Sequence, residues 1–249
     1  MTRSRRRTLL AVLPAALFAT TGAVALVAAP KQHCLARFST MVENRSRNQK
    51  HNAYLAAAKL NGAVIQPGET FSFNERVGSF SKDVGYRKAP VSFNGQLINS
   101  FGGGVCQTST TTYNAALRAG LGIVERCRHR FAPNYVPPGL DAAVAYYNID
   151  LKLKNPYPFS IRIEAGIKGD RLEVGFYGAG QAKRVQLDTQ VRHVRNPGLF
   201  ELGDRTAAGK IRNSGKPGYF VQVFRTIDGA KEMVSSDNYP VMERVVDRR

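Results

Sequence analysis

Residues 102–121 read GGGVCQTSTTTYNAALRAGL and carry the most informative pattern in the chain. A run of three glycines leads to a single cysteine, Cys106. Small and apolar residues then recur from Tyr113 to Gly120 at the spacing of one face of a helix. The stretch therefore predicts a tight glycine turn that opens into a helix, with the cysteine in the first helical turn.

A cysteine in that position is suited to nucleophilic chemistry. It lies among unpaired backbone N–H groups at the positive end of the helix dipole, and both features favour the thiolate that attacks carbonyl carbon. Gly102, Gly103 and Gly104 let the backbone approach a substrate or adopt positive φ. Gln107 is placed to polarise a carbonyl or to cap the helix. The alternative is that Cys106 is a small packed core residue after an ordinary glycine turn.

A cysteine nucleophile also needs a base and, in most cases, an acid that orients the base. His129 follows the expected helix, and neighbouring arginines favour the neutral imidazole that accepts a proton. Asp141 and Asp150 are the candidate acids. Each of the three also has a structural explanation: a surface histidine, an Asx turn at Asp141, and a paired acid in a strand at Asp150.

Arg118 and Arg126 complete the candidate binding residues. A guanidinium group can hold a substrate carboxylate through two parallel hydrogen bonds. The alternative for both is an ion pair on the protein surface.

Four segments resemble the VanW-like family of cell-envelope proteins, which is named for an accessory gene of glycopeptide-resistance clusters. The resemblance implies a role at the cell envelope and does not specify a reaction. The most specific pieces are PGETFSFN and GGGVCQTSTTTYNAA. The segments are residues 44–78, 85–121, 125–144 and 150–163.

A second resemblance concerns the order of the reactive residues. The cysteine helix, then LRAGLGI, then a strand carrying His129 is similar to the core of transglutaminase-like or papain-like cysteine enzymes. That resemblance implies that Cys106 attacks, His129 moves the proton, and Asp141 or Asp150 orients the imidazole. It is an analogy of fold, which argues for function only by association. Cys127 departs from the family pattern, because it places a second thiol near His129.

The first 29 residues have the composition of a leader. Four arginines precede an apolar run from Leu9 to Ala29, which is typical of a signal peptide or an uncleaved membrane anchor. Ala23-Val24-Ala25 offers a small-x-small cleavage site. The sequence thus predicts export to an extracytoplasmic or periplasmic location, with or without a membrane anchor.

The chain is strongly basic, with 36 Lys and Arg against 18 Asp and Glu and a formal net charge of +18. Such a balance favours an anionic polymer as partner. Because export argues against nucleic acid, we expect peptidoglycan, another wall polymer or the membrane surface. The alternative is solvated surface charge without a specific partner.

The numbers and spacing of the cysteines and histidines limit the disulfides and metal sites that the chain can form. Three cysteines, Cys34, Cys106 and Cys127, leave at least one free thiol unless two chains pair. A Cys106–Cys127 disulfide would remove the nucleophile, and cleavage of the leader would leave Cys34 on a mobile tail. The histidines are scattered without metal-ligand spacing, and neither a phosphate loop nor a dinucleotide motif is present, so no metal or cofactor is expected.

The expected architecture is α+β. A core of helices and antiparallel sheet occupies residues 40–178, and a β-rich extension occupies 179–249. A helix is expected over 44–61, and the Asn94-Gly95 pair predicts a hairpin. The other expected strands are 63–65, 70–73, 122–127, 142–154, 159–165, 171–176, 185–194, 219–226 and 230–234.

The sequence supports two classes of function. The first is a cysteine-dependent acyl transferase or amidase that acts on peptidoglycan peptides. The second is a non-catalytic module that binds the envelope, or a scaffold for other wall enzymes. The distance between Cys106 and His129 in the folded protein discriminates between them.

Overall fold

The computed structural model describes residues 31–93, 96–203 and 208–248. The leader expected over residues 1–29 lies outside this part of the chain. The described residues form fifteen strands, three α-helices and one short 3-10 helix. The sheets are mostly antiparallel and the protein is β-rich.

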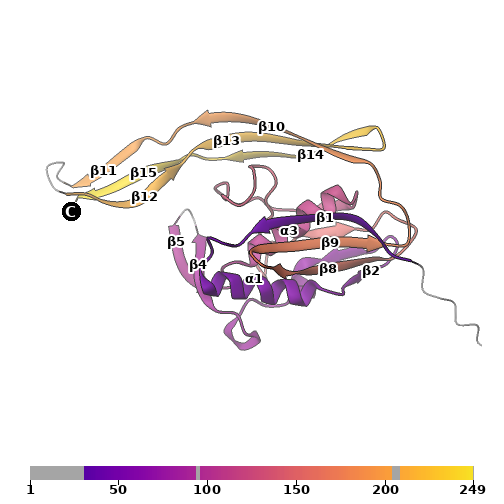
Figure 1. Ribbon diagram of the computed structural model, residues 1–249. Coiled ribbons are helices and arrows are strands. Elements are labelled where there is room, and N and C mark those ends of the chain that lie inside the picture. The colour runs from indigo at the N-terminus through magenta and orange to yellow at the C-terminus, as the bar shows by residue number, and fades with distance from the viewer. Residues whose placement is uncertain (1–30, 94–95, 204–207, 249) are drawn as a thin grey trace, which may run out of the picture. The chain divides into compact units, whose positions relative to one another are not determined.

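A four-stranded antiparallel sheet forms the base of the core (Figure 1). The strands expected over 159–165 and 171–176 are confirmed as β8 and β9, which form a hairpin that pairs Lys168 with Arg171 across a two-residue turn. The edge strand, His33–Met41, was not expected. Cys34 lies in this strand, so the mobile tail expected at Cys34 is wrong. A bulge after Cys34 interrupts the alternation that would have revealed this strand. The strand order is β1 (His33–Met41), β9 (Arg171–Gly178), β8 (Ile161–Lys168) and β2 (Val64–Ile65).

Two helices, α1 (Arg47–Leu60) and α3 (Val105–Arg118), contact this sheet. The expected first helix is confirmed within three residues at its start. Ser46 and Gln49 form a reciprocal capping box there, which satisfies backbone N–H groups that have no partner within the helix. After Leu60, the chain leaves the helix through Asn61 and Gly62, as expected.

The interior of α3 is unusual because its Ser and Thr run, Thr108–Thr112, is fully buried. Hydroxyl groups lower helix propensity when they compete with the backbone, and their burial is costly without partners. Here the hydroxyls are bonded: Thr112 donates to the Thr108 carbonyl at 2.8 Å, and Ser109 to the Ala142 carbonyl at 2.7 Å. These short side chains therefore let α3 pack closely against its neighbours.

Smaller elements connect the sheet and the helices. The two short strands expected on either side of the Pro67-Gly68 turn, β2 and β3, lie in different sheets. The expected Asn94-Gly95 hairpin is confirmed in its flanking strands, although the two turn residues lie outside the described part. The elements are β3 (Thr70–Ser72), α2 (Phe73–Val77), η1 (Lys82–Val84), β4 (Lys88–Phe93), β5 (Gln96–Phe101), β6 (Gly122–Glu125) and β7 (Lys152–Lys154).

The long strand expected over residues 142–154 is wrong. Only Lys152–Lys154 is a strand, and residues 142–151 form a loop with two isolated bridges. Hydrogen bonds from side chains, and not pairing with another strand, fix the position of this loop. Ser109 bonds the Ala142 carbonyl and Asn74 bonds the Ile149 carbonyl at 2.8 Å. The buried apolar residues of this segment therefore lie in a loop and not in a paired strand.

All described elements after Gly178 are strands. The strands expected over 219–226 and 230–234 are confirmed and are joined by a turn at Asp228-Gly229, with Ile227 opposite Ala230. Val221 and Val223 belong to the same buried cluster as residues of α3. Residues 31–249 form one compact unit. The division of the chain into two parts near residue 178 stays a prediction. The sheets have the orders β10-β13-β14 and β11-β15-β12, and only β11–β15 is parallel. The bounds are β10 (Val185–Arg195), β11 (Leu199–Gly203), β12 (Lys210–Lys216), β13 (Gly218–Ile227), β14 (Ala230–Tyr239) and β15 (Met242–Arg248).

Among the described residues, no helix has the length and apolar character needed to span a membrane.

We expect Gly104→Ala to destabilise the fold. Gly104 has a φ of 113°, and a Cβ there would overlap the Gln49 carbonyl oxygen of α1. The strain and the overlap together should lower the free energy of unfolding by about 2 kcal/mol or more, measured by urea denaturation. Gly166→Ala is the matched control, because nothing lies within 4 Å of its Cβ position. Equal stability of the two variants would contradict the packing role of Gly104.

Candidate active site

Cys106 is the second residue of α3, as expected, and follows the helix cap at Gly104. Its side chain is partly buried, and its Sγ lies 3.4 Å from the Val144 carbonyl oxygen in the 142–151 loop. The helix thus carries the thiol to the place where the loop passes. All three cysteines are free thiols in the structure.

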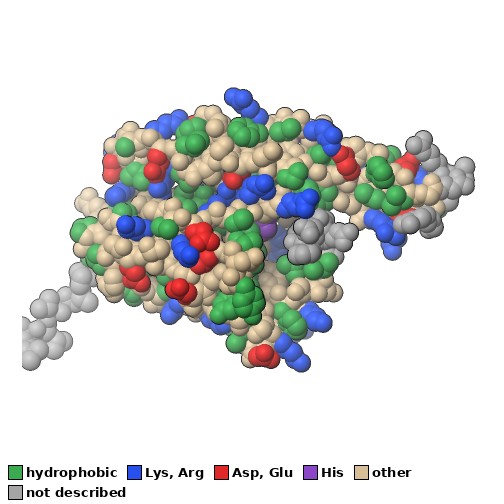
Figure 2. Space-filling view, turned by 180° about the vertical axis from the view of Figure 1, so that it is seen from behind, with side chains coloured by type: hydrophobic (Ala, Val, Ile, Leu, Met, Phe, Trp, Pro, Cys, Tyr) green, Lys and Arg blue, Asp and Glu red, His purple; other side chains and the backbone are tan. Residues whose placement is uncertain are grey.

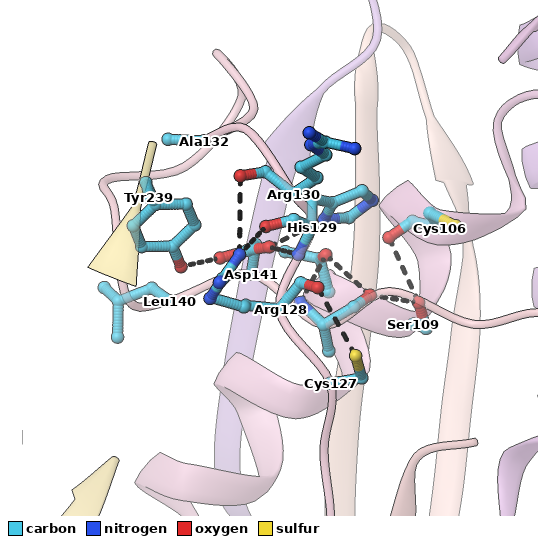
Figure 3. Close-up of polar contacts among 12 residues, drawn as sticks. Cys106, Ser109, Cys127, Arg128, His129, Arg130, Ala132, Leu140, Asp141 and Tyr239 are labelled. Atoms are coloured by element: carbon cyan, nitrogen blue, oxygen red, sulfur yellow. Dashed lines mark hydrogen bonds and ion pairs between the residues drawn. The ribbon is translucent and has the colours of Figure 1, made fainter. Parts of the chain in front are cut away.

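His129 is held by Asp141. The His129 Nδ1 atom lies 2.6 Å from the Asp141 Oδ2 atom, and the His129 backbone N–H donates to the same oxygen at 2.7 Å. Because Nδ1 is occupied by the carboxylate, Nε2 is the nitrogen available to a thiol. Figure 3 shows the imidazole between Asp141 and Cys106. The structure therefore brings together three of the four expected catalytic residues.

Burial and mutual charge set the protonation of the thiol and the imidazole. Burial alone would raise the pKa of the Cys106 thiol, but the hydrogen bond and positive charge of His129 bring it below its ordinary value. Burial alone would lower the pKa of His129, yet hydrogen bonds with Asp141 and Cys106 raise it to about 9. The contact between the two groups therefore favours the thiolate–imidazolium pair relative to the neutral thiol and imidazole.

The carboxylate of Asp141 has no exposed surface and is surrounded by donors. In addition to His129, Arg126 Nη2 lies 3.2 Å from Oδ1 and the Tyr239 hydroxyl donates to the same oxygen. Burial would raise the pKa of Asp141, but the hydrogen bond and charge of His129 lower it, so the group stays ionised. An ionised carboxylate at this place fixes the tautomer and direction of the imidazole.

Arg126 acts within the protein and does not face a free ligand. Its Nε donates to the Asp141 carbonyl at 2.6 Å, and its Nη1 pairs with Asp237 at 2.6 Å. Only 6% of its side chain is exposed. Arg126 therefore positions Asp141, and its predicted binding of a substrate carboxylate would require these contacts to open.

Asp150 lies away from the imidazole. It accepts hydrogen bonds from the Ser72 hydroxyl at 2.6 Å and the Asn74 backbone at 2.9 Å. It thus joins β3 and α2 to the strand that follows it. Between the two candidate acids, the structure places Asp141, and not Asp150, next to His129.

The remaining expected binding residues also have internal partners. Gln107 donates to the Met41 carbonyl at 2.8 Å and accepts from Arg45 at 2.9 Å, which ties β1 to α3. Arg118 lies over the Phe38 ring at 4.4 Å, at the far end of α3 from Cys106. Their roles in substrate binding stay predictions.

The three glycines have a packing explanation. A Cβ on Gly102 would lie 2.8 Å from Phe80, and one on Gly103 would lie 2.7 Å from the Pro90 carbonyl oxygen. Side chains at these places would push the chain away from Phe80 and β4, and would displace the start of α3. The glycines are needed for the position of Cys106 whether or not they touch a substrate.

Three further residues contribute to the site and were missed from the sequence. The Tyr135 ring lies edge-on to His129 at 6.5 Å, and its hydroxyl lies 3.4 Å from the Cys106 carbonyl oxygen. Tyr239 and Asp237 reach Asp141 and Arg126 from β14. A weak signal was available for this pair, because an acid two residues before a tyrosine on a strand places both side chains on one face.

A comparison with known protein families identifies the class to which this chain belongs. The family described as "VanW like protein" matches residues 48–177, which is more than half of the chain. The chain belongs to the VanW-like family, as the sequence motifs indicated.

Two curated relatives match this chain. The protein named "Uncharacterized protein YoaR" from Bacillus subtilis (strain 168) is 38% identical over 145 residues, which cover 58% of this chain and 48% of the relative. "Vancomycin B-type resistance protein VanW" from Enterococcus faecalis (strain ATCC 700802 / V583) is 38% identical over 114 residues, 43% of this chain and 41% of the relative. The matched part thus covers less than half of each relative.

Among solved structures, "Crystal structure of HP0197-G5" matches 28% of this chain and 100% of that chain at 14% identity. Its TM-score is 0.17, which is too low to support a structural argument. No three His, Cys, Asp or Glu side chains within the described ranges form a cluster that could hold a metal ion.

We expect Cys106 to react faster than an ordinary thiol because His129 stabilises its thiolate. At pH 7, His129→Ala should slow alkylation of Cys106 by iodoacetamide about tenfold and move the midpoint of the pH–rate profile to higher pH. Peptide mass spectrometry of each cysteine measures the rate. His193→Ala on β10 is the matched control, and Cys127 serves as an internal ordinary thiol. Equal rates at Cys106 in both variants would argue against a thiolate–imidazolium pair.

The two candidate acids should differ in their effect on the imidazole. In the wild type, His129 should titrate near its pKa of about 9, measured by NMR of its ring protons. Asp141→Asn removes the negative partner and should lower the pKa of His129 markedly, so that imidazolium is lost at lower pH. Asp150→Asn should leave the titration unchanged. Circular dichroism at the same pH establishes that each variant is folded, and a shift caused by Asp150→Asn alone would reverse the assignment.

Proposed function

We propose that this chain is a cysteine-dependent acyl transferase or amidase that acts on peptidoglycan peptides or a related envelope substrate. The observation that carries the proposal is the contact of Asp141 with His129 Nδ1 at 2.6 Å, which leaves the second nitrogen for Cys106. A lowered pKa of the thiol and a raised pKa of the imidazole support the same assignment. Perturbed groups of this kind are common in active sites, although structural ion pairs also produce them.

The proposed reaction has two steps. The Cys106 thiolate attacks the carbonyl carbon of an amide, and the carbon–nitrogen bond breaks as the leaving amine takes the proton of the His129 imidazolium. The resulting thioester is then attacked by water or by a second amine, whose proton passes to His129 as the thiolate leaves. Asp141 keeps the imidazole in the required tautomer throughout and is a positioning residue.

The proposed fold of the catalytic part is a core of helix and antiparallel sheet of the transglutaminase-like or papain-like kind. The order Cys106, His129, Asp141 along the chain supports this, as does the packing of α3 against β1 and β9. Because one fold can carry many activities, the contacts of the site, and not the fold, support the proposed function.

The proposed location is outside the cytoplasm, with the leader either removed or retained as an anchor. The family membership supports a role at the cell envelope, and the printed name of one relative supports an association with vancomycin resistance. Lys and Arg side chains are spread over the face in Figure 2 among acidic ones, which suits weak, salt-dependent binding to an anionic polymer such as peptidoglycan or to a membrane surface. Nucleic acid is not a proposed partner.

One observation favours the non-catalytic alternative, in which the chain binds or scaffolds envelope components. The Gln107 and Arg126 side chains, expected to bind substrate, are occupied by internal hydrogen bonds. In this alternative Cys106 is a packed thiol.

Trapping of a thioester separates the two functions. With synthetic stem peptides, we expect the wild-type protein to gain the mass of the acyl group on Cys106, detected by intact-mass and peptide mass spectrometry after acid quenching. Cys106→Ser should abolish the thioester, and His129→Ala should reduce its rate by at least 100-fold, as expected for the loss of a general acid–base group. Cys34→Ser is the matched control and should behave as the wild type. An unmodified, unreactive Cys106 together with intact binding to purified cell wall would favour the binding module.

A further inference from the structure

A hollow is lined in part by the 142–151 loop, which also passes Cys106. It has a volume of about 350 Å³ and is lined by β3, α2, β6, β7 and the turn at residues 145–149. This volume is at the lower end of the range of ligand pockets, so it suits one side chain or a single small group. None of the contacts of Cys106, His129 and Asp141 described above involves this cavity.

Asn74 lies at this cavity with one polar atom unused. Its Nδ2 donates to the carbonyl oxygens of Ala145 at 3.1 Å and Ile149 at 2.8 Å, so the orientation of the amide is fixed by the turn it holds. The residue is only 7% exposed, and its Oδ1 atom is buried without a hydrogen-bond partner. Because an unpaired buried acceptor is costly, a donor that reached Oδ1 after a small movement of the turn would be favoured.

The charge of the cavity is opposite to that of the protein. Three carboxylates line it, those of Glu75, Glu125 and Asp150, against one ammonium group, that of Lys152. The Lys152 Nζ atom is already paired with Glu125 at 2.8 Å. Glu75 is exposed at the rim. In a chain with a net charge of +18, such a local acidic group favours a cation as ligand.

Two tyrosines form one wall of the cavity. Tyr147 is 93% exposed and Tyr146 is 39% exposed, and their rings meet edge to face at 5.0 Å. Exposed aromatic rings beside carboxylates attract cations through their π faces. No cluster of three His, Cys, Asp or Glu residues that could hold a metal ion occurs in the described ranges, so the fitting cation is organic. An alkylammonium group satisfies every feature: it carries a positive charge, donates hydrogen bonds and has an apolar stem.

The cavity lies within reach of the thiol. Val144, whose carbonyl accepts the Cys106 thiol, is two residues from Tyr146, which is at most about 7 Å along the chain. The Tyr146 ring also lies 6.2 Å from Phe80, the residue that packs on Gly102. A single extended peptide can therefore present a carbonyl to Cys106 and a side chain to the cavity.

We propose that this cavity is a specificity subsite for a side chain bearing a primary amine, next to the carbonyl group on which Cys106 acts. The proposal rests on the function proposed above, since it defines the substrate as an amine-bearing peptide. The ammonium group is compensated by Glu75 and packs its stem against Tyr147, and it reaches Asn74 Oδ1 once the turn at 145–149 shifts.

The test is a binding experiment that needs no turnover. The full chain with Cys106→Ser, labelled with ¹⁵N, is titrated with Nα-acetyl-lysine-N-methylamide and followed by NMR of the amides of residues 145–149. We expect saturable shifts with a dissociation constant on the order of 1 mM, as for a small fragment, and weaker binding at higher salt. The Nε-acetylated form of the probe lacks the charge and should not bind.

Variants identify the groups responsible. Glu75→Gln and Tyr147→Ala should each weaken binding about threefold to fivefold, because each removes one exposed electrostatic or cation–π contact. Glu43→Gln and Tyr54→Ala are the matched controls: both residues are exposed and neither lines the cavity, so binding should be unchanged.

Several outcomes would overturn the subsite. These are the absence of saturable shifts at 145–149, equal binding of the acetylated probe, or preferential binding of neutral N-acetylglucosamine. The two proposals fail separately. Amine binding without thioester formation removes the enzyme and keeps the cavity, whereas thioester formation without amine binding removes only the subsite.

Discussion

The buried carboxylate of Asp141 is the group on which the rest of the site depends. It accepts hydrogen bonds from four donors: the backbone N–H and the Nδ1 of His129, the guanidinium of Arg126 and the hydroxyl of Tyr239. An unpaired charge at this depth would be strongly destabilising, so the donors are required for folding as well as for chemistry. With its charge balanced by these donors, the ionised carboxylate directs the imidazole toward Cys106. The shifted pKa values of His129 and Cys106 follow from that orientation.

The Ser and Thr run of α3 shows how a polar sequence can build a core. Each hydroxyl donates a hydrogen bond to a backbone carbonyl of α3, of α1 or of the 142–151 loop, so burial leaves few unsatisfied groups. The same bonds place the loop over the helix. The position of Val144 next to the thiol, and of the turn held by Asn74, is thus a consequence of side chains that are poor helix formers.

The sequence was sufficient for the parts of the site that are local. The glycine turn, the helix with Cys106 in its first turn, and the order of His129 and Asp141 could all be predicted, because short-range pattern determines them. The choice of Asp141 over Asp150 could not, since it depends on where the 142–151 loop runs. Tyr239 and β1 were also missed, because each finds its partner about 100 residues or more away in the chain.

The contribution of β14 to the site has a consequence for the making of the protein. Residues 48–177 carry the family match and all three reactive side chains, yet Arg126 and Asp141 find Asp237 and Tyr239 in the last thirteen residues of the chain. Synthesis runs from the amino terminus, so the thiol is made long before its carboxylate is fully supported. A nascent or truncated chain without β14 would hold the whole motif but not the full set of contacts around Asp141, and the site is complete only when β14 is in place.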